Sequence, residues 1–283
     1  MKKTMQAENL QTMRKIDTEE LKKIQLKILR EVADFCEKNN IKYWIDCGTL
    51  LGAIRHKGYI PWDDDIDVGM LREDYDKFQR IFNKEDGKYT FVSYESDPTF
   101  YLPSGKVIDN STVLYEPDEN GVKLAVNIDI FVYDNAPDDD KEVKKMFDER
   151  DRLRNAYMRT SEHINFEKNF LKRILRLGRK ILYKIRYCGR AQYCKDAIAN
   201  MIKNSKKYAT CKTERVGDFM SFSRMVCSRR AFDSFVDVEF EGEKYKAPVG
   251  YDEWLRAFYG DYMQLPPVKE RVSHHFFVAF YKD

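Results

Sequence analysis

The sequence has few of the features that mark secreted, disulfide-bonded or zinc-binding proteins. Its 283 residues include only six cysteines, and no two of them form a Cys-x-x-Cys pair. The lysine-rich N-terminus carries no apolar segment of the kind found in signal peptides. We therefore expect reduced thiols and a cytoplasmic protein, because cysteines without a secretory signal are typical of reducing compartments.

Long apolar runs and a strong excess of charge are also missing. No stretch approaches the roughly 18–20 apolar residues that a membrane-spanning helix needs. The formal net charge of +3 is too small to indicate a nucleic-acid-binding protein. With 43% hydrophobic and 34% charged residues, the composition is that of a soluble globular protein with a sizeable core.

The most informative stretch is 42–76. An apolar run at 43–45 leads to Gly48-Thr49, a basic turn follows at 55–58, and four aspartates then fall within 63–67. On a strand, alternate aspartates of this run would project from one face. Carboxylates so close together repel each other unless a cation lies among them, although a solvated acidic turn is the common alternative.

The residues around the aspartates favour a metal site. Carboxylate oxygens suit Mg²⁺ or Mn²⁺, and Mg²⁺ is usually held by one or two carboxylates together with substrate phosphates. A Gly48-Thr49 pair that opens a helix can bind phosphate through backbone N–H groups. The sequence therefore predicts a divalent cation and a phosphate-bearing substrate at this place.

Residues 124–134 form the clearest strand pattern. Ile128 and Ile130 fall on one face, and Asn127, Asp129 and Phe131 fall on the other. An aspartate inside so apolar a strand is costly to bury without a partner. We expect Asp129 to face a metal or cationic site, either as a ligand or as the group that orients and deprotonates an acceptor hydroxyl.

Other segments show ordinary periodicities. Apolar residues at helical spacing predict helices, and alternating residues predict strands. The expected helices are 17–39, 71–82 and 251–259, and the expected strands are 43–46, 89–95, a hairpin within 101–116, 231–240 and 245–249. Residues 1–15 are expected to be a mobile start.

The run GTLLGAIRHKGYIPWDDDID resembles the signature of the LicD-type phosphocholine transferase family, which includes the fukutin-related transferases. A second run, PVGYDEWLRAFYGDYMQLPP, resembles the C-terminal region of the same family. The resemblance implies an α+β fold, with a nucleotidyltransferase-like mixed sheet flanked by helices. We expect one catalytic domain over 1–283, comprising a core at 17–137, a basic helical insertion at 140–212 and a closing segment at 215–283.

The resemblance also implies roles for particular residues. Asp65, Asp67 and Asp129 are expected to be catalytic, and with Asp63 nearby they are the expected metal ligands. The expected donor- or phosphate-binding residues are Gly48, Thr49, Arg55, His56, Lys106, Arg271 and His274. For the basic residues the alternative is a solvated surface position.

The activity that the resemblance implies is phosphoryl transfer. The donor would be a CDP-alcohol such as CDP-choline, the acceptor a sugar hydroxyl, and the leaving group CMP. The product would be a decorated glycan such as a teichoic acid, capsular polysaccharide, lipopolysaccharide or lipid-linked oligosaccharide. Transfer of glycerol- or ribitol-phosphate, nucleotidyl transfer that releases pyrophosphate, and a non-catalytic nucleotide-binding protein stay open as alternatives.

Residues 168–190 stand apart because they contain nine lysines and arginines and no acid. Apolar residues recur among these cations at steps of three and four. A basic amphipathic helix is typical of binding to an anionic membrane surface. The alternative is a surface helix that packs on the core with its charges solvated.

Overall fold

The computed structural model describes residues 13–84, 87–115, 124–161, 190–221, 223–272 and 278–282, with a few positions between 174 and 185. The helices are α2 (Thr18–Lys38), α3 (Cys47–His56), α4 (Arg72–Ile81), α5 (Asp140–Ser161), α7 (Arg190–Ser205) and α8 (Tyr251–Tyr259). Short 3₁₀ helices are η1 (Phe82–Lys84), η3 (Lys206–Tyr208), η4 (Arg229–Phe232) and η5 (Val268–Glu270). The strands are β1 (Lys15–Ile16), β2 (Trp44–Ile45), β3 (Asp67–Leu71), β4 (Tyr89–Val92), β5 (Gly105–Asp109), β6 (Thr112–Tyr115), β7 (Asn127–Ala136), β8 (Arg215–Gly217), β9 (Val226–Ser228), β10 (Phe235–Phe240), β11 (Glu243–Pro248) and β12 (Val278–Tyr281).

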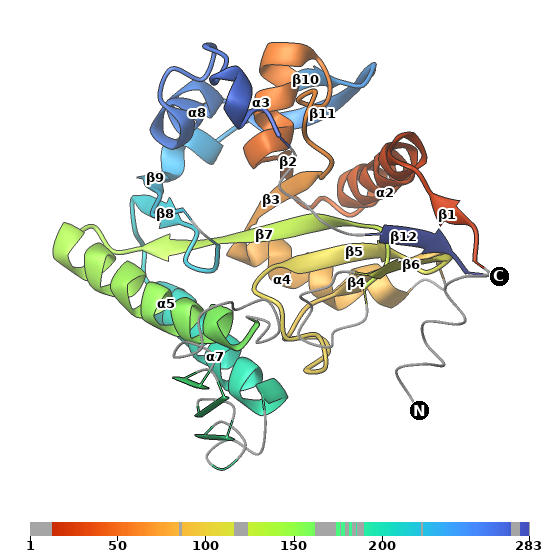
Figure 1. The fold of residues 1–283 in the computed structure, drawn as a ribbon. Helices are drawn as coiled ribbons and strands as arrows, with labels where there is room; N and C mark the ends of the chain where they lie inside the picture. The colour runs from red at the N-terminus through yellow and green to blue at the C-terminus, as the bar shows by residue number, and fades with distance from the viewer. Residues whose placement is uncertain are drawn as a thin grey trace.

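A mixed sheet in the order β2-β3-β7-β5-β4 forms the centre of the molecule (Figure 1). Strands β3 and β7 are parallel, and the other neighbours in this order are antiparallel. The far end of β7 continues into a second ladder with β8 and β9. The expected α+β fold with a mixed sheet is confirmed.

One face of the sheet is covered by α2 and α4. The alternation predicted for β7 places Ile128 and Ile130 on this buried side. Helix α2 begins where expected, because the Asp17 side chain accepts a hydrogen bond from the Glu20 backbone N–H and caps the first turn. Its buried stripe packs on the strands, so the predicted amphipathic helix is confirmed.

The opposite face carries a close cluster of aromatic rings. Trp44 on β2 is fully buried and lies over Gly69 on β3, where an added Cβ would approach the indole to 2.3 Å. The rings of Tyr133 and Phe232 lie 5.2 and 4.6 Å from that of Trp44, and Trp254 of α8 packs on Tyr133 at 5.2 Å. This cluster attaches the C-terminal segment to the sheet.

Helices α5 and α7 pack against each other beside the end of β7 (Figure 1). A separate apolar cluster, which includes Ala136, Phe147 and Phe219, joins α5 to the strand. The segment 168–190 lies mostly outside the described residues. Among the positions within it that are described, the large apolar side chains are exposed: Ile174, Leu175, Leu177, Ile181, Leu182 and Ile185.

Three local predictions were wrong. The strand expected at 231–240 starts only at Phe235, because the Ser228 side chain caps the short helix η4. The N-terminal residues were expected to be mobile up to 15, but Lys15 and Ile16 pair with β12. The run of alternate aspartates is not a strand, since only Asp67 belongs to β3.

The described residues contain five cysteines, and all five are free thiols. None of the described helices combines the length and the apolar content that crossing a membrane requires.

Candidate active site

The acidic run brings its carboxylates to the first residue of β3. Asp67 is buried, and its parallel partner in the register of the sheet is Asp129 of β7. Asp63 and Asp65 are half-buried in the loop that precedes the strand. The sequence pattern placed them on the same strand as Asp67, but they precede the strand, and their charges still act on the Asp67 carboxyl by raising its pKa.

The start of α3 lies against these carboxylates. A Cβ added at Gly48 would be 2.8 Å from Asp63 Oδ2 and 4.0 Å from Asp67 Oδ2, so only glycine leaves this space open. The Thr49 hydroxyl accepts a hydrogen bond of 2.8 Å from the Asp67 backbone N–H. The Gly48-Thr49 pair therefore joins the beginning of α3 to the acidic strand.

Asp46, which the sequence reasoning missed, caps α3. It is fully buried and accepts hydrogen bonds from Cys47 N at 2.9 Å, Tyr133 Oη at 2.5 Å and Trp254 Nε1 at 3.1 Å. Burial raises the pKa of its carboxyl to about 6, while these hydrogen bonds oppose the shift. An aspartate directly before a Cys-Gly-Thr helix start was the signal that could have identified it.

The site concentrates negative charge. The pKa of Asp67 is raised well above its ordinary value, first by burial and then by the charges of Asp65, Asp129, Asp46 and Asp63. Buried carboxylates in this arrangement are stabilised when a cation is added.

The Asp129 carboxylate is bound by two side chains, Lys106 on the neighbouring strand β5 and Ser104 in the loop just before that strand. Lys106 Nζ lies 2.8 Å from both carboxylate oxygens of Asp129, and it also donates to Asn127 Oδ1 at 3.1 Å. The Ser104 hydroxyl donates to Asp129 Oδ1 at 2.6 Å. Lys106 was expected to face the donor phosphates; its direct partner in the structure is Asp129, and the phosphate role stays a prediction. Ser104 was not foreseen.

A cavity of about 470 Å³ opens in front of these residues. One wall carries Asp65, Asp67, Lys106 and Asp129. The cavity is also lined by Arg154, Tyr157 and Met158 of α5 together with Met220, Ser221 and Ser223. The volume lies within the usual range for small-molecule sites.

Three of the expected basic residues lie elsewhere. Arg55 and His56 end α3, and Arg55 donates from Nε to His56 Nε2 at 2.9 Å and from a terminal nitrogen to the Tyr262 carbonyl at 2.7 Å. The Arg271 guanidinium lies 5.6 Å from the Trp62 ring centre. None of the three lines the cavity described above. His274 lies outside the described residues.

The acidic side chains fit a divalent cation that is completed by substrate. Among the described residues, no three histidine, cysteine, aspartate or glutamate side chains are already arranged around a metal position. Mg²⁺ in phosphoryl-transfer sites needs only one or two carboxylates, because substrate phosphates and water fill the other positions. Asp65 and Asp67, with Asp63 beside Gly48, meet that requirement with oxygen ligands.

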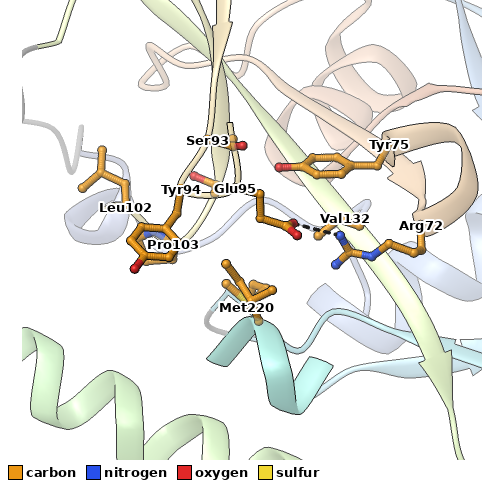
Figure 2. A pocket seen from close by; sticks show the side chains of 12 residues that line it. Arg72, Tyr75, Ser93, Tyr94, Glu95, Leu102, Pro103, Val132 and Met220 are labelled. Carbon is orange, nitrogen blue, oxygen red and sulfur yellow. Dashed lines mark hydrogen bonds and ion pairs between the residues drawn. The ribbon is translucent and has the colours of Figure 1, made fainter. Parts of the chain in front are cut away.

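A second, much smaller cavity is lined by residues that include Arg72, Glu95, Leu102 and Pro103 (Figure 2). Its volume of about 20 Å³ holds one water molecule and no substrate. Figure 2 shows the ion pair between Arg72 and Glu95 at its edge, where the two charged groups are 3.2 Å apart. This cavity is therefore too small to be a substrate-binding site.

The central mixed sheet carries an aspartate at the same register position on each of two parallel neighbouring strands, Asp67 of β3 and Asp129 of β7. Residues 40–177 match the family model described as the LicD/FKTN/FKRP nucleotidyltransferase domain, so this part of the chain is a LicD family domain. It is a LicD-type phosphotransferase.

Two characterised relatives are similar to different extents. The chain is 29% identical over 271 residues to the lipopolysaccharide cholinephosphotransferase LicD of Haemophilus influenzae. The aligned residues make up 95% of this chain and 99% of that protein. It is 39% identical over 66 residues to the human ribitol 5-phosphate transferase FKRP. This aligned stretch makes up 22% of this chain and 13% of that protein.

Proposed function

We propose that the protein transfers phosphocholine from CDP-choline to a sugar hydroxyl of a cell-surface glycan or its lipid-linked precursor, with release of CMP. The observation that carries this proposal is the register pairing of Asp67 and Asp129 on parallel strands, in the wall of a cavity of substrate size. Similarity to a cholinephosphotransferase along nearly the whole chain supports the choice of phosphocholine.

The residues of the acidic wall have distinct roles in this proposal. Asp65 and Asp67, with Asp63, hold Mg²⁺ or Mn²⁺, which neutralises charge on the donor diphosphate when it is bound. Asp129 accepts the proton of the acceptor hydroxyl and orients its oxygen toward the phosphorus. Lys106 and Ser104 fix the Asp129 carboxylate, and the N–H groups at Gly48 approach the donor phosphates.

Two other reactions use the same site chemistry. Ribitol- or glycerol-phosphate transfer differs from phosphocholine transfer only in the alcohol, and the similarity to FKRP over 22% of the chain favours keeping it as the second candidate. Nucleotidyl transfer would place the attack on the other phosphorus and release pyrophosphate.

Product analysis separates these reactions. We expect the protein with Mg²⁺ and CDP-choline to release CMP in a manner that depends on a glycan acceptor, and to release it at least about tenfold more slowly from CDP-ribitol or CDP-glycerol. Nucleotide release followed by chromatography, together with mass analysis of the glycan, measures both products. Pyrophosphate release from CTP and an alcohol phosphate, without CMP, would contradict the proposal.

We also propose peripheral contact with an anionic membrane through 168–190. This segment contains nine cations and no acid, and six large apolar side chains within it are exposed. Such a surface suits a bilayer that carries anionic headgroups. Contact of this kind would bring the cavity close to lipid-linked acceptors.

Vesicle sedimentation tests this contact. We expect replacement of Lys172, Arg173, Arg176 and Lys180 by Glu to abolish binding to vesicles that contain anionic lipid, because each cation near such a surface contributes about 1 kcal/mol. Replacement of four exposed cations elsewhere, Lys23, Lys27, Lys144 and Lys244, provides the control with the same change in net charge. Equal binding of both variants would exclude the segment as the contact.

A further inference from the structure

We propose that the wall formed by α5 together with Met220, Ser221 and Ser223 binds the nucleotide half of the donor, with Arg154 contacting its phosphates. This inference rests on the proposed function, since it assigns the leaving nucleotide to a place in the same cavity. It gives the first helix of the expected insertion a direct part in substrate binding, which no sequence motif indicated.

The helix presents one face to the cavity and another to solvent. Tyr157 and Met158 come three and four residues after Arg154, so both lie beside it on the helix surface, and all three line the cavity that the aspartates also line. Arg152 lies on the other side, with 66% of its side chain exposed and an ion pair to Glu149. The two arginines therefore have the same helix context but different surroundings.

The wall is fixed in place from behind. Arg150, one turn before Arg154, is fully buried and donates hydrogen bonds to the carbonyls of Asp218 and Ser223. The Asp218 carboxylate in turn accepts from Met220 N at 2.8 Å and Ser221 N at 2.9 Å. Helix and loop thus form one rigid surface, which reduces the entropy lost when a ligand binds.

The charges in the cavity explain why a cation is needed on this side. Among the described residues that line the cavity, the cations are Lys106 and Arg154, while the acids are Asp64, Asp65, Asp67 and Asp129. Lys106 is already engaged by Asp129. A diphosphate that enters between the walls therefore meets Arg154 as the second positive group, and a guanidinium can bind phosphate oxygens in a bidentate manner.

The surroundings of Arg154 favour an anionic partner. The pKa of its guanidinium is lowered from the ordinary value, first by burial and then by the charge of Arg150, while the charge of Asp151 opposes the shift. A phosphate at this position would offset both effects. The rings of Phe131, Tyr157 and Phe258 line the same cavity and offer apolar faces to a pyrimidine base.

Calorimetric titration with CDP and with cytidine tests the assignment directly. We expect Arg154→Met to weaken CDP binding about 10- to 100-fold in the presence of Mg²⁺ and to leave cytidine binding unchanged, because only CDP carries phosphates. Arg154→Lys should lose less affinity, since it keeps the charge but not the planar fork. Arg152→Met, the same change on the solvent face, should bind CDP as the unaltered protein does.

The outcomes separate this inference from the proposed function. If the unaltered protein binds CDP and Arg154→Met binds it equally well, the wall is assigned wrongly and the proposed function is unaffected. If Arg154→Met weakens CDP and cytidine by the same factor, the residue has a structural role and the inference fails. If the unaltered protein binds no CDP, both the inference and the CDP-alcohol donor are wrong.

Discussion

Replacing Asp67 by Asn should lower the rate of transfer by about 10³-fold while making the protein more stable in the absence of divalent metal. The carboxylate is buried among Asp65, Asp129, Asp46 and Asp63, and their repulsion opposes folding of the charged form. Asparagine keeps the shape and removes the charge. The free energy of unfolding in EDTA should therefore rise by about 1 kcal/mol.

The opposite signs of these two effects distinguish loss of a ligand from misfolding. Addition of Mg²⁺ should raise the melting temperature of the unaltered protein and raise that of Asp67→Asn much less, since only a bound cation stabilises the native state by mass action. Asp237→Asn is the control, because Asp237 pairs with Lys246 at the surface. Activity of Asp67→Asn within tenfold of the unaltered protein would refute the assignment of the acidic site.

Replacing Arg72 by Met should lower the free energy of unfolding by about 3–5 kcal/mol. Arg72 donates from Nε to Asp134 Oδ1 at 2.7 Å and from a terminal nitrogen to Oδ2 at 2.8 Å. Asp134 is fully buried near the end of β7, so the substitution leaves a buried charge without its main partner. The bidentate pair fixes the start of α4 on the strand that carries Asp129, which links stability to the geometry of the site.

Urea denaturation of a double-mutant cycle measures this pair. Arg72→Met with Asp134→Asn should recover part of the loss, because the unpaired charge is then gone. Arg30→Met is the comparison at the surface, where the pair with Glu243 is exposed to solvent and should contribute little to stability. If both arginine variants lose the same small free energy of unfolding, the Arg72–Asp134 pair does not stabilise the fold as a buried ion pair.

Sequence patterns predicted the elements that depend on burial of one face of a single helix or strand. The amphipathic period of α2 and the alternation along β7 follow from burial of one face, so they are readable in the sequence and the structure confirms them. Asp129 could be selected because an acid is costly inside an apolar strand. The glycine at position 48 could be selected because a small residue pair that opens a helix suits phosphate binding.

Contacts between distant segments could not be predicted in this way. Asp63 and Asp65 fit a strand by alternation, yet they lie in the loop before β3, because the pairing of β3 with β7 begins only at Asp67. The ends of the chain meet as β1 and β12, a pairing of two residues too short to leave a pattern. Arg55 and His56 follow the Gly-Thr pair closely in sequence, but α3 carries them to its other end.

The sequence by itself determined the family, the acidic residues and the strand that carries Asp129, because each depends on residue type and spacing over a short range. Only the tertiary structure decided that Asp67 and Asp129 stand side by side, that Lys106 holds the latter, and that α5 closes the cavity with Arg154. The reason is that these arrangements follow from parallel pairing and helix docking between segments far apart in the chain. The spacing of apolar residues within one segment carries no information about such contacts.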